Sequence, residues 1–175
     1  MNTSLMNLSR TGPQNPDDYD LQSVAAHEMD EVLGIGGSGS FVGATYFGTG
    51  SPLNYPTGPV GSMDLFRYAS NGVRSYTTST SATAYFSIDG GKTKLRFFNQ
   101  TQGADYGDWA PGQAGPPEVQ DAYGTPGVDV DIGVNELTAL NVVGYTLPTV
   151  PEPGTGTLFL GGLIVVGIIC DAADK

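Results

Sequence analysis

Closely spaced turn-forming residues constrain the fold of this chain most, because they leave room only for short strands and short helices. Four stretches rich in such residues divide the sequence, at 34–39, 48–61, 102–117 and 123–133. The chain of 175 residues holds 26 glycines and 12 prolines, a share just below the level typical of disordered proteins. We therefore expect one modest domain with a small core and many loops.

Runs of aromatic and β-branched residues between these turns predict short strands at 41–47, 63–69 and 73–77. The clearest strand pair is 83–88 with 92–98, which Asp89-Gly90-Gly91 joins as a hairpin turn. In its second strand basic residues alternate with less polar ones, which predicts a solvated face formed by Lys92, Lys94 and Arg96.

Two helices are expected, one before and one after these strands. The first runs from 21 to 33, with Asp18 or Asp20 as N-cap and Gly34 as its end. The second runs from 136 to 143 and is capped by Asn135 and ended by Gly144, with a buried stripe of Leu137, Leu140 and Val143.

The charge balance and the scarcity of two residue types exclude several functions. The net charge is −11, which repels a polyanion and argues against a nucleic-acid partner. Cys170 is the single cysteine, so the chain has neither an internal disulfide nor a cysteine-rich metal site. With His27 as the single histidine, chemistry that needs two histidines cannot occur within one chain.

The first predicted helix carries the one constellation with evident chemistry. His27 and Glu31 are four residues apart and therefore lie on the same helical face. A rigid helix with two ligands at this spacing suits a metal ion. Glu28 lies beside His27, where it would act on a water at the metal rather than on the metal itself.

An uncharged run of 17 residues, 154–170, approaches the about 20 residues needed to cross a bilayer. Its glycines are tolerated in membrane helices, so we expect a single membrane segment here, with a buried strand or core helix as the alternative. Val150-Pro151-Glu152-Pro153 directly before this run resembles the PEP-CTERM sorting signal of exopolysaccharide-producing bacteria. The resemblance implies recognition of Pro151, Glu152 and Pro153 by an exosortase, export, a transient single-pass anchor, and a location at the cell envelope or outside the cell.

The segment VAAHEMDEVLGIGG, 24–37, resembles the HExxHxxG helix of metzincin and leishmanolysin-like metallopeptidases. His27, Glu28 and Gly34 match this motif, and Glu31 replaces its second histidine. The wider chain is similar to predicted bacterial metalloproteases with PEP-CTERM tails, through the segments SMDLFRY (62–68), FSIDGG (86–91), YGDWA (106–110) and ELTALNVVGY (136–145). The resemblance spans about residues 20–145.

This resemblance also implies a third ligand. Trp109 matches the tryptophan of a Ser-His-Trp segment in leishmanolysin-like members, and Asp108 then takes the position of the histidine. The implied metal ligands are His27, Glu31 and Asp108, with Glu28 as the catalytic base. One nitrogen and two carboxylates can bind zinc, although manganese, iron or calcium compete better at such a site. Two carboxylates also weaken the Lewis acidity of the ion, so we expect slow hydrolysis.

We therefore expect an α+β fold in three parts: a flexible stretch over 1–19, a truncated zincin-like domain over 20–147, and the sorting signal over 148–175. In the domain, the metal-site helix precedes short antiparallel strands and a C-terminal helix. The expected function is that of an exported metallopeptidase, weakly active or degenerate, with peptide substrates. The alternative is a non-catalytic surface or matrix protein whose sorting tail is its only functional element.

Overall fold

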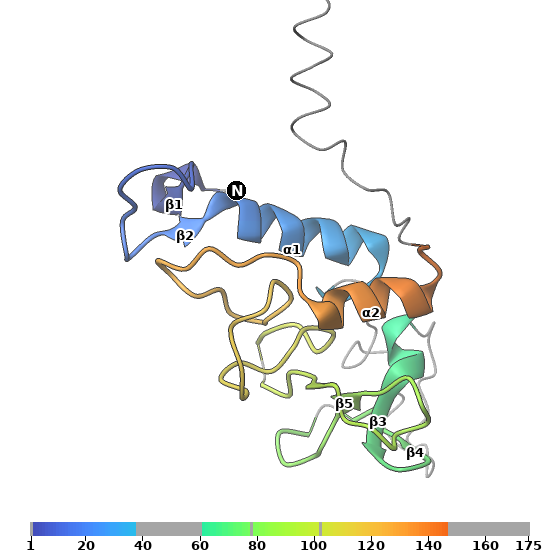
Figure 1. Ribbon diagram of the computed structural model, residues 1–175. Coiled ribbons are helices and arrows are strands. Elements are labelled where there is room, and N and C mark those ends of the chain that lie inside the picture. The colour runs from blue at the N-terminus through green and yellow to red at the C-terminus, as the bar shows by residue number, and fades with distance from the viewer. Residues whose placement is uncertain (1, 38–60, 78, 102, 147–175) are drawn as a thin grey trace, which may run out of the picture.

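The computed structural model describes residues 2–37, 61–77, 79–101 and 103–146, which form a small α+β fold (Figure 1). These residues contain two α-helices, a two-stranded sheet and a four-stranded sheet. The helix α1 (Leu21–Leu33) precedes the four-stranded sheet in sequence, and α2 (Val134–Val143) follows it. Figure 1 shows α1 and the four-stranded sheet toward opposite ends of the molecule.

The helix α1 has the bounds that its sequence predicts, because both of its ends are set by local chemistry. The carboxylate of Asp20 accepts a hydrogen bond of 2.8 Å from the backbone N–H of Ser23, so Asp20 is the N-cap. At the other end Gly34 adopts the left-handed conformation, with φ 94°, and its N–H bonds back to the last turn of the helix.

The helix α2 begins two residues earlier than expected, at Val134, and its N-cap is Gly133. The carboxylate of Glu136 accepts the N–H of Gly133 at 3.0 Å and closes this end of the helix. Asn135 is not the cap, because its side chain donates instead to Glu118 at 2.7 Å. Of the predicted buried stripe, Leu140 is buried but Leu137 is exposed.

The four-stranded sheet is antiparallel, with the strand order β4-β3-β5-β6. Its strands are as short as the turn spacing predicts: β3 (Arg67–Ser70), β4 (Val73–Arg74), β5 (Tyr85–Phe86) and β6 (Arg96–Phe97). The predicted strand over 63–69 begins instead as a 3-10 helix, η3 (Met63–Phe66). The carboxylate of Asp64 accepts the N–H of Gly61 at 2.9 Å, which favours a turn over an extended strand.

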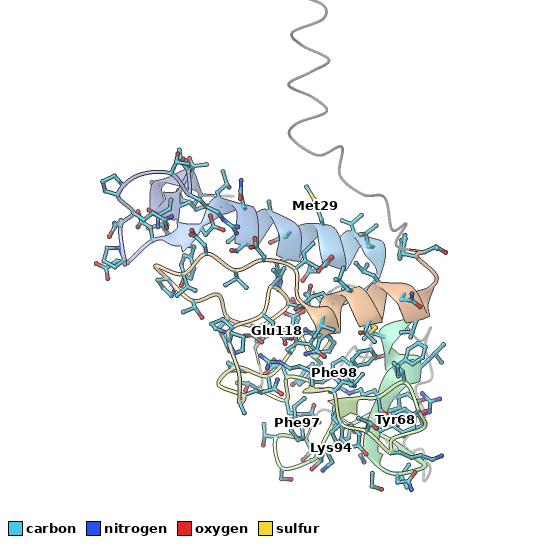
Figure 2. The ribbon with its side chains drawn as sticks, viewed as in Figure 1. Met29, Tyr68, Lys94, Phe97, Phe98 and Glu118 are labelled. Carbon is cyan, nitrogen blue, oxygen red and sulfur yellow. The ribbon has the colours of Figure 1, made fainter. Side chains whose placement is uncertain are left out.

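The alternation in β6 was interpreted wrongly at Arg96, which is buried rather than solvated. Its guanidinium donates to Asp121 at 3.0 Å and lies 3.3 Å from Glu118. The next residue, Phe97, is exposed, and it is labelled with Lys94 in Figure 2. Alternating residue types along a strand show that its two faces differ. They do not show which face is covered, and here residues 118–121 cover the face that carries Arg96.

The core is built around Trp109, which is fully buried. Its ring stacks on Phe86 with a centroid distance of 5.6 Å and contacts Phe98 at 5.1 Å. The indole N–H donates to the buried carboxylate of Glu136 at 3.1 Å, so the ring satisfies its polar group inside the core. Trp109 therefore joins the four-stranded sheet to α2.

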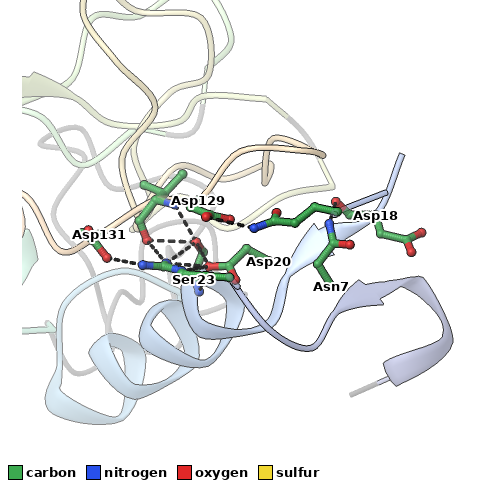
Figure 3. Close-up of polar contacts among 9 residues, drawn as sticks. Asn7, Asp18, Asp20, Ser23, Asp129 and Asp131 are labelled. Atoms are coloured by element: carbon green, nitrogen blue, oxygen red, sulfur yellow. Dashed lines mark hydrogen bonds and ion pairs between the residues drawn. The ribbon is translucent and has the colours of Figure 1, made fainter. Parts of the chain in front are cut away.

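The N-terminal residues, predicted to be a flexible stretch over 1–19, instead form local structure. A 3-10 helix, η1 (Thr3–Leu5), leads into β1 (Met6–Asn7), which pairs in parallel with β2 (Tyr19–Asp20). Arg10 bridges Asp20 and Asp131, both at 2.5 Å (Figure 3). This stretch is thus attached both to the start of α1 and to a segment more than a hundred residues away.

The membrane segment expected at the end of the fold has no counterpart among the described residues, which corrects the predicted fold class and the localisation that depended on that segment. Among the described residues, no helix is both long enough and apolar enough to pass through a bilayer. The longer of the two α-helices, α1, has 13 residues, whereas a span needs about 20.

Several predictions fall on residues outside the described ranges. These include the strand at 41–47, the apolar run 154–170 and the sorting tripeptide of Pro151, Glu152 and Pro153. Recognition of that tripeptide by an exosortase therefore stays a prediction from the sequence.

Replacing Arg10 by alanine tests the attachment of the N-terminal stretch. Burial alone would raise the pKa of Asp20, but hydrogen bonds from Arg10 and Ser23 outweigh it and lower this pKa to about 2. Arg10→Ala leaves a carboxylate that is 1% exposed without its cation, so we expect a loss of about 2–3 kcal/mol in unfolding free energy. The side chain of Asp131 is 85% exposed, and Asp131→Ala should cost less than about 1 kcal/mol. Equal effects of the two variants in urea denaturation would contradict this account.

Candidate metal centre

The helix α1 brings the first two candidate ligands together. His27 and Glu31 lie one turn apart on the same face, and His27 Nε2 is 3.4 Å from Glu31 Oε1. Two ligand atoms around one tetrahedral zinc ion are about 3.3–3.4 Å apart, given metal–ligand distances near 2.0–2.1 Å. This pair therefore has the separation that a shared ion requires.

The third candidate, Asp108, reaches the same place from a distant part of the chain. The backbone around it is extended: the N–H of Asn99 donates to its carbonyl at 2.8 Å, and Trp109 forms a bridge with Phe98. Successive side chains of an extended chain point to opposite faces, so with Trp109 in the core Asp108 points toward α1. Its Oδ2 lies 3.9 Å from His27 Nε2.

The described structure thus places His27, Glu31 and Asp108 in one group whose ligand atoms all lie within 4.8 Å of one another. This group could hold a metal ion. The widest separation exceeds what one zinc ion spans, so binding requires the carboxylates to move closer.

The ring of His27 is oriented by a hydrogen bond on its far side. Its Nδ1 lies 2.9 Å from the carbonyl oxygen of Val119, and because a carbonyl can only accept, Nδ1 carries the proton. In the neutral ring Nε2 then has a free lone pair, and this is the nitrogen that faces Glu31 and Asp108. A backbone carbonyl that fixes the tautomer in this way is typical of histidines that bind metals.

Asp108 is oriented in a comparable way. Its Oδ1 accepts hydrogen bonds from the backbone N–H of Gly37 at 2.6 Å and from the amide of Gln120 at 2.9 Å. These donors occupy one carboxylate oxygen and leave Oδ2 facing His27. Gln120 is itself held in place, because its backbone N–H donates to Glu136 at 3.2 Å.

Two glycines after α1 allow this close approach. A Cβ on Gly37 would overlap the carboxylate of Glu31, and a Cβ on Gly36 would overlap the amide of Gln120 and lie 2.8 Å from Asp108 Oδ1. Gly36 also has a φ of 79°, which side chains disfavour. The backbone at this point therefore forms a wall against which both carboxylates rest.

The electrostatics of the group favour a cation. Burial raises the pKa of Glu31, and the neighbouring charge of Asp108 raises it further, while His27 opposes the rise. Burial likewise raises the pKa of Asp108, although the hydrogen bonds from Gly37 and Gln120 act in the other direction. Two carboxylates that lose hydration beside each other are stabilised by a positive ion between them. The donor set, its orientation and its charge all fit a metal.

Glu28, the predicted base, lies next to His27 on α1 and is exposed. Its charge contributes to the raised pKa of Glu31, as does that of Asp105. Glu28 is thus near the ligand group without being one of the three side chains that converge.

We compared the chain with protein-family models, with curated proteins and with solved structures, and no match was found.

Sequence reasoning missed the residues that support the ligands, namely Gly36, Gly37, Val119 and Gln120. The two glycines had a visible signal, because Gly34-Ile35-Gly36-Gly37 begins three residues after Glu31 and so dense a group of glycines indicates a close backbone approach. Val119 and Gln120 had no such signal, since the first acts through its backbone carbonyl and the second is an ordinary amide.

Replacing Gly37 by alanine tests whether Glu31 needs its close approach to the backbone at this position. The overlapping atoms are the end of the flexible Glu31 side chain, so the fold should survive while the carboxylate is displaced. We expect zinc affinity to fall by about tenfold or more, measured by competition with a chromogenic chelator. Gly112→Ala is the control, because an added Cβ there meets no atom within 4 Å; its φ of 70° strains the backbone of this variant without touching the ligand group. Equal losses of affinity in both variants would exclude the proposed contact.

The raised pKa of Asp30 predicts how the stability of the fold depends on pH. It is buried with Oδ2 unpartnered, and burial, with a smaller effect from Glu136, raises its pKa from 3.8 to about 6, against the opposing charge of His27. A raised acid pKa stabilises the fold at low pH, and this contribution is lost as the pH rises from 3.8 to about 6. We expect Asp30→Asn to be about 2 kcal/mol more stable relative to the wild type at pH 7.5 than at pH 4. Urea denaturation at both pH values measures this difference, and a constant difference would refute it.

Proposed function

We propose that this chain is a metal-dependent peptide hydrolase. The observation that carries the proposal is the convergence of His27 Nε2 with one oxygen each from Glu31 and Asp108, all within 4.8 Å. The likeness of residues 24–37 to the zincin helix supports peptides as the substrate class. The coarser conclusion, that these side chains could hold a metal ion, does not depend on this likeness.

Zinc is the ion that we propose, because a neutral imidazole and two carboxylates are among its usual ligands. When bound here, zinc would polarise a peptide carbonyl and make a water molecule more acidic. The two carboxylates offset much of its charge, so we propose a slow hydrolase. Manganese, iron and calcium are the competing ions, since they favour oxygen ligands more strongly.

The chain's own residues have distinct roles in this proposal. His27 presents Nε2 because Val119 holds its other nitrogen, and Asp108 presents Oδ2 because Gly37 and Gln120 hold its other oxygen. Glu28 accepts a proton from the attacking water and returns it to the leaving amine. Its exposed position on α1 supports this role, because water has free access to it.

Metal analysis and a protease assay on the same preparation test the proposal. We expect about one zinc per chain, lost in the Glu31→Ala/Asp108→Ala double variant, and casein hydrolysis that Glu28→Gln lowers by about a hundredfold or more without loss of zinc. Asp17→Asn is the control for Glu28→Gln, because it removes one carboxylate charge from an exposed residue that belongs neither to the ligand group nor to α1.

Each result separates the proposal from its competitors. Absence of zinc from the wild type would refute the metal centre and favour the non-catalytic surface protein. Zinc without hydrolysis would refute the enzyme and leave a protein that only binds the metal. Equal activity of the wild type and Glu28→Gln would remove Glu28 from the mechanism.

A further inference from the structure

A pocket of about 170 Å³ lies beside the candidate metal centre. Its walls are the first half of α1, with Val24 and His27, and the segment 117–130, with Val119 and Val128. The rings of Tyr19 and Tyr123 also line it. The volume is close to that of a cavity of about 150 Å³ that holds a benzene molecule in another protein, so one side chain with a ring or a branched end would fill it.

The carboxylates that line this pocket already have partners within the chain. Asp20 binds Arg10 and Ser23, and Asp121 accepts from Arg96 at 3.0 Å. Glu118 accepts from Asn135 at 2.7 Å. These contacts hold the walls, and Glu118 Oε2, which has no hydrogen-bond partner among the described residues, lies near Arg96. The larger part of the surface that the pocket exposes is apolar.

Gly124 allows one wall of the pocket to pack closely. A Cβ added at Gly124 would come within 3.1–3.3 Å of the ring of Tyr19, so this ring lies directly against the backbone of the opposite segment. Tyr19 belongs to β2, which the N-terminal stretch pairs with through β1. The pocket therefore depends on the order of that stretch, which the sequence predicted to be flexible.

The pocket and the metal centre share a side chain and its support. The ring of His27 lines the pocket and faces Glu31 and Asp108 with Nε2. Val119 lines the same pocket, and its carbonyl fixes the ring of His27. A ligand side chain in the pocket would thus be separated from Glu31 and Asp108 only by the imidazole ring of His27.

We propose that this pocket binds one neutral apolar side chain, aromatic or branched aliphatic, of a peptide held at the metal centre. That a peptide bond beside this pocket is hydrolysed rests on the proposed function. The preference for an apolar side chain rests on the pocket alone. The lining includes three carboxylates and no lysine or arginine, so an acidic side chain would find no cation to pair with. The net charge of −11 disfavours acidic peptides in the same way.

Binding of capped amino acids to the full chain tests the pocket without any need for catalysis. The probes are N-acetyl-phenylalaninamide, N-acetyl-alaninamide and N-acetyl-aspartamide, titrated by NMR. We expect the phenylalanine derivative to bind about tenfold or more tightly than the alanine derivative, and the aspartate derivative not to bind. Because an apolar side chain would bind through the apolar part of the lining and not through a metal ion, this preference should persist in EDTA.

Val128→Phe fills the pocket and should weaken binding of the phenylalanine derivative by about tenfold or more. Val134→Phe is the matched control: Val134 is 74% exposed and does not line the pocket, whereas Val128 is 37% exposed and does. Tyr123→Ala is a second variant, at an exposed ring, for the case that Val128→Phe does not fold. If folded Val128→Phe or Tyr123→Ala binds the phenylalanine derivative as tightly as the wild type, the proposal is overturned.

The two proposals fail in different ways. A wild type that binds zinc but does not distinguish the phenylalanine from the alanine derivative refutes the pocket and leaves the metal centre. A wild type that makes this distinction but binds no zinc refutes the hydrolase and leaves a pocket for apolar side chains. If both hold, peptides with phenylalanine next to the cleaved bond should be hydrolysed about tenfold faster, in kcat/KM, than those with alanine, and Val128→Phe should remove the difference.

Discussion

The hydrogen bond between the indole of Trp109 and the carboxylate of Glu136 is the interaction on which the rest of the structure depends. It ties the sheet to α2 inside the core, where an unpaired indole N–H or a lone carboxylate would be costly. The backbone of Trp109 also lies between Phe98 and Asp121 in two bridges, so one residue joins these segments to α2. With the ring fixed inward, its neighbour Asp108 faces α1.

The candidate centre is assembled from one local and one distant contribution, and its charge is poorly balanced without a cation. Glu31 and Asp108 meet a single imidazole, and burial raises the pKa of both. Without a bound cation, such an arrangement lowers the stability of the fold. Its supports are hydrogen bonds on the far side of two of the groups: the ring of His27 donates to the carbonyl of Val119, and the amide of Gln120 donates to Asp108. The backbone N–H of Gln120 donates in turn to Glu136, so the support of Asp108 is connected to the buried contact between Glu136 and Trp109.

The parts of the fold that local chemistry determines could be predicted from the sequence. The bounds and caps of α1 depend on neighbouring residues, and so does the face that His27 and Glu31 share. Asp108 came from a resemblance, since no spacing along the chain reveals it. Gln120 and the burial of Arg96 depend on how the segment 118–121 packs, and a strand pattern contains no information about what covers it. The membrane segment was inferred from the length and apolar character of the run 154–170, which lies outside the described residues, and no described helix is long and apolar enough to be one.

Arg10 has a consequence for the order in which the molecule assembles. It contacts Asp131 across 121 residues of chain, and closing so large a loop costs conformational entropy before any contact compensates for it. The helix α1 can form early because its caps are local, whereas the wall that joins Tyr19 to Gly124 must wait until the two halves of the chain meet. We therefore expect the pocket beside His27 to be completed late in folding, after α1, which carries His27 and Glu31, has formed.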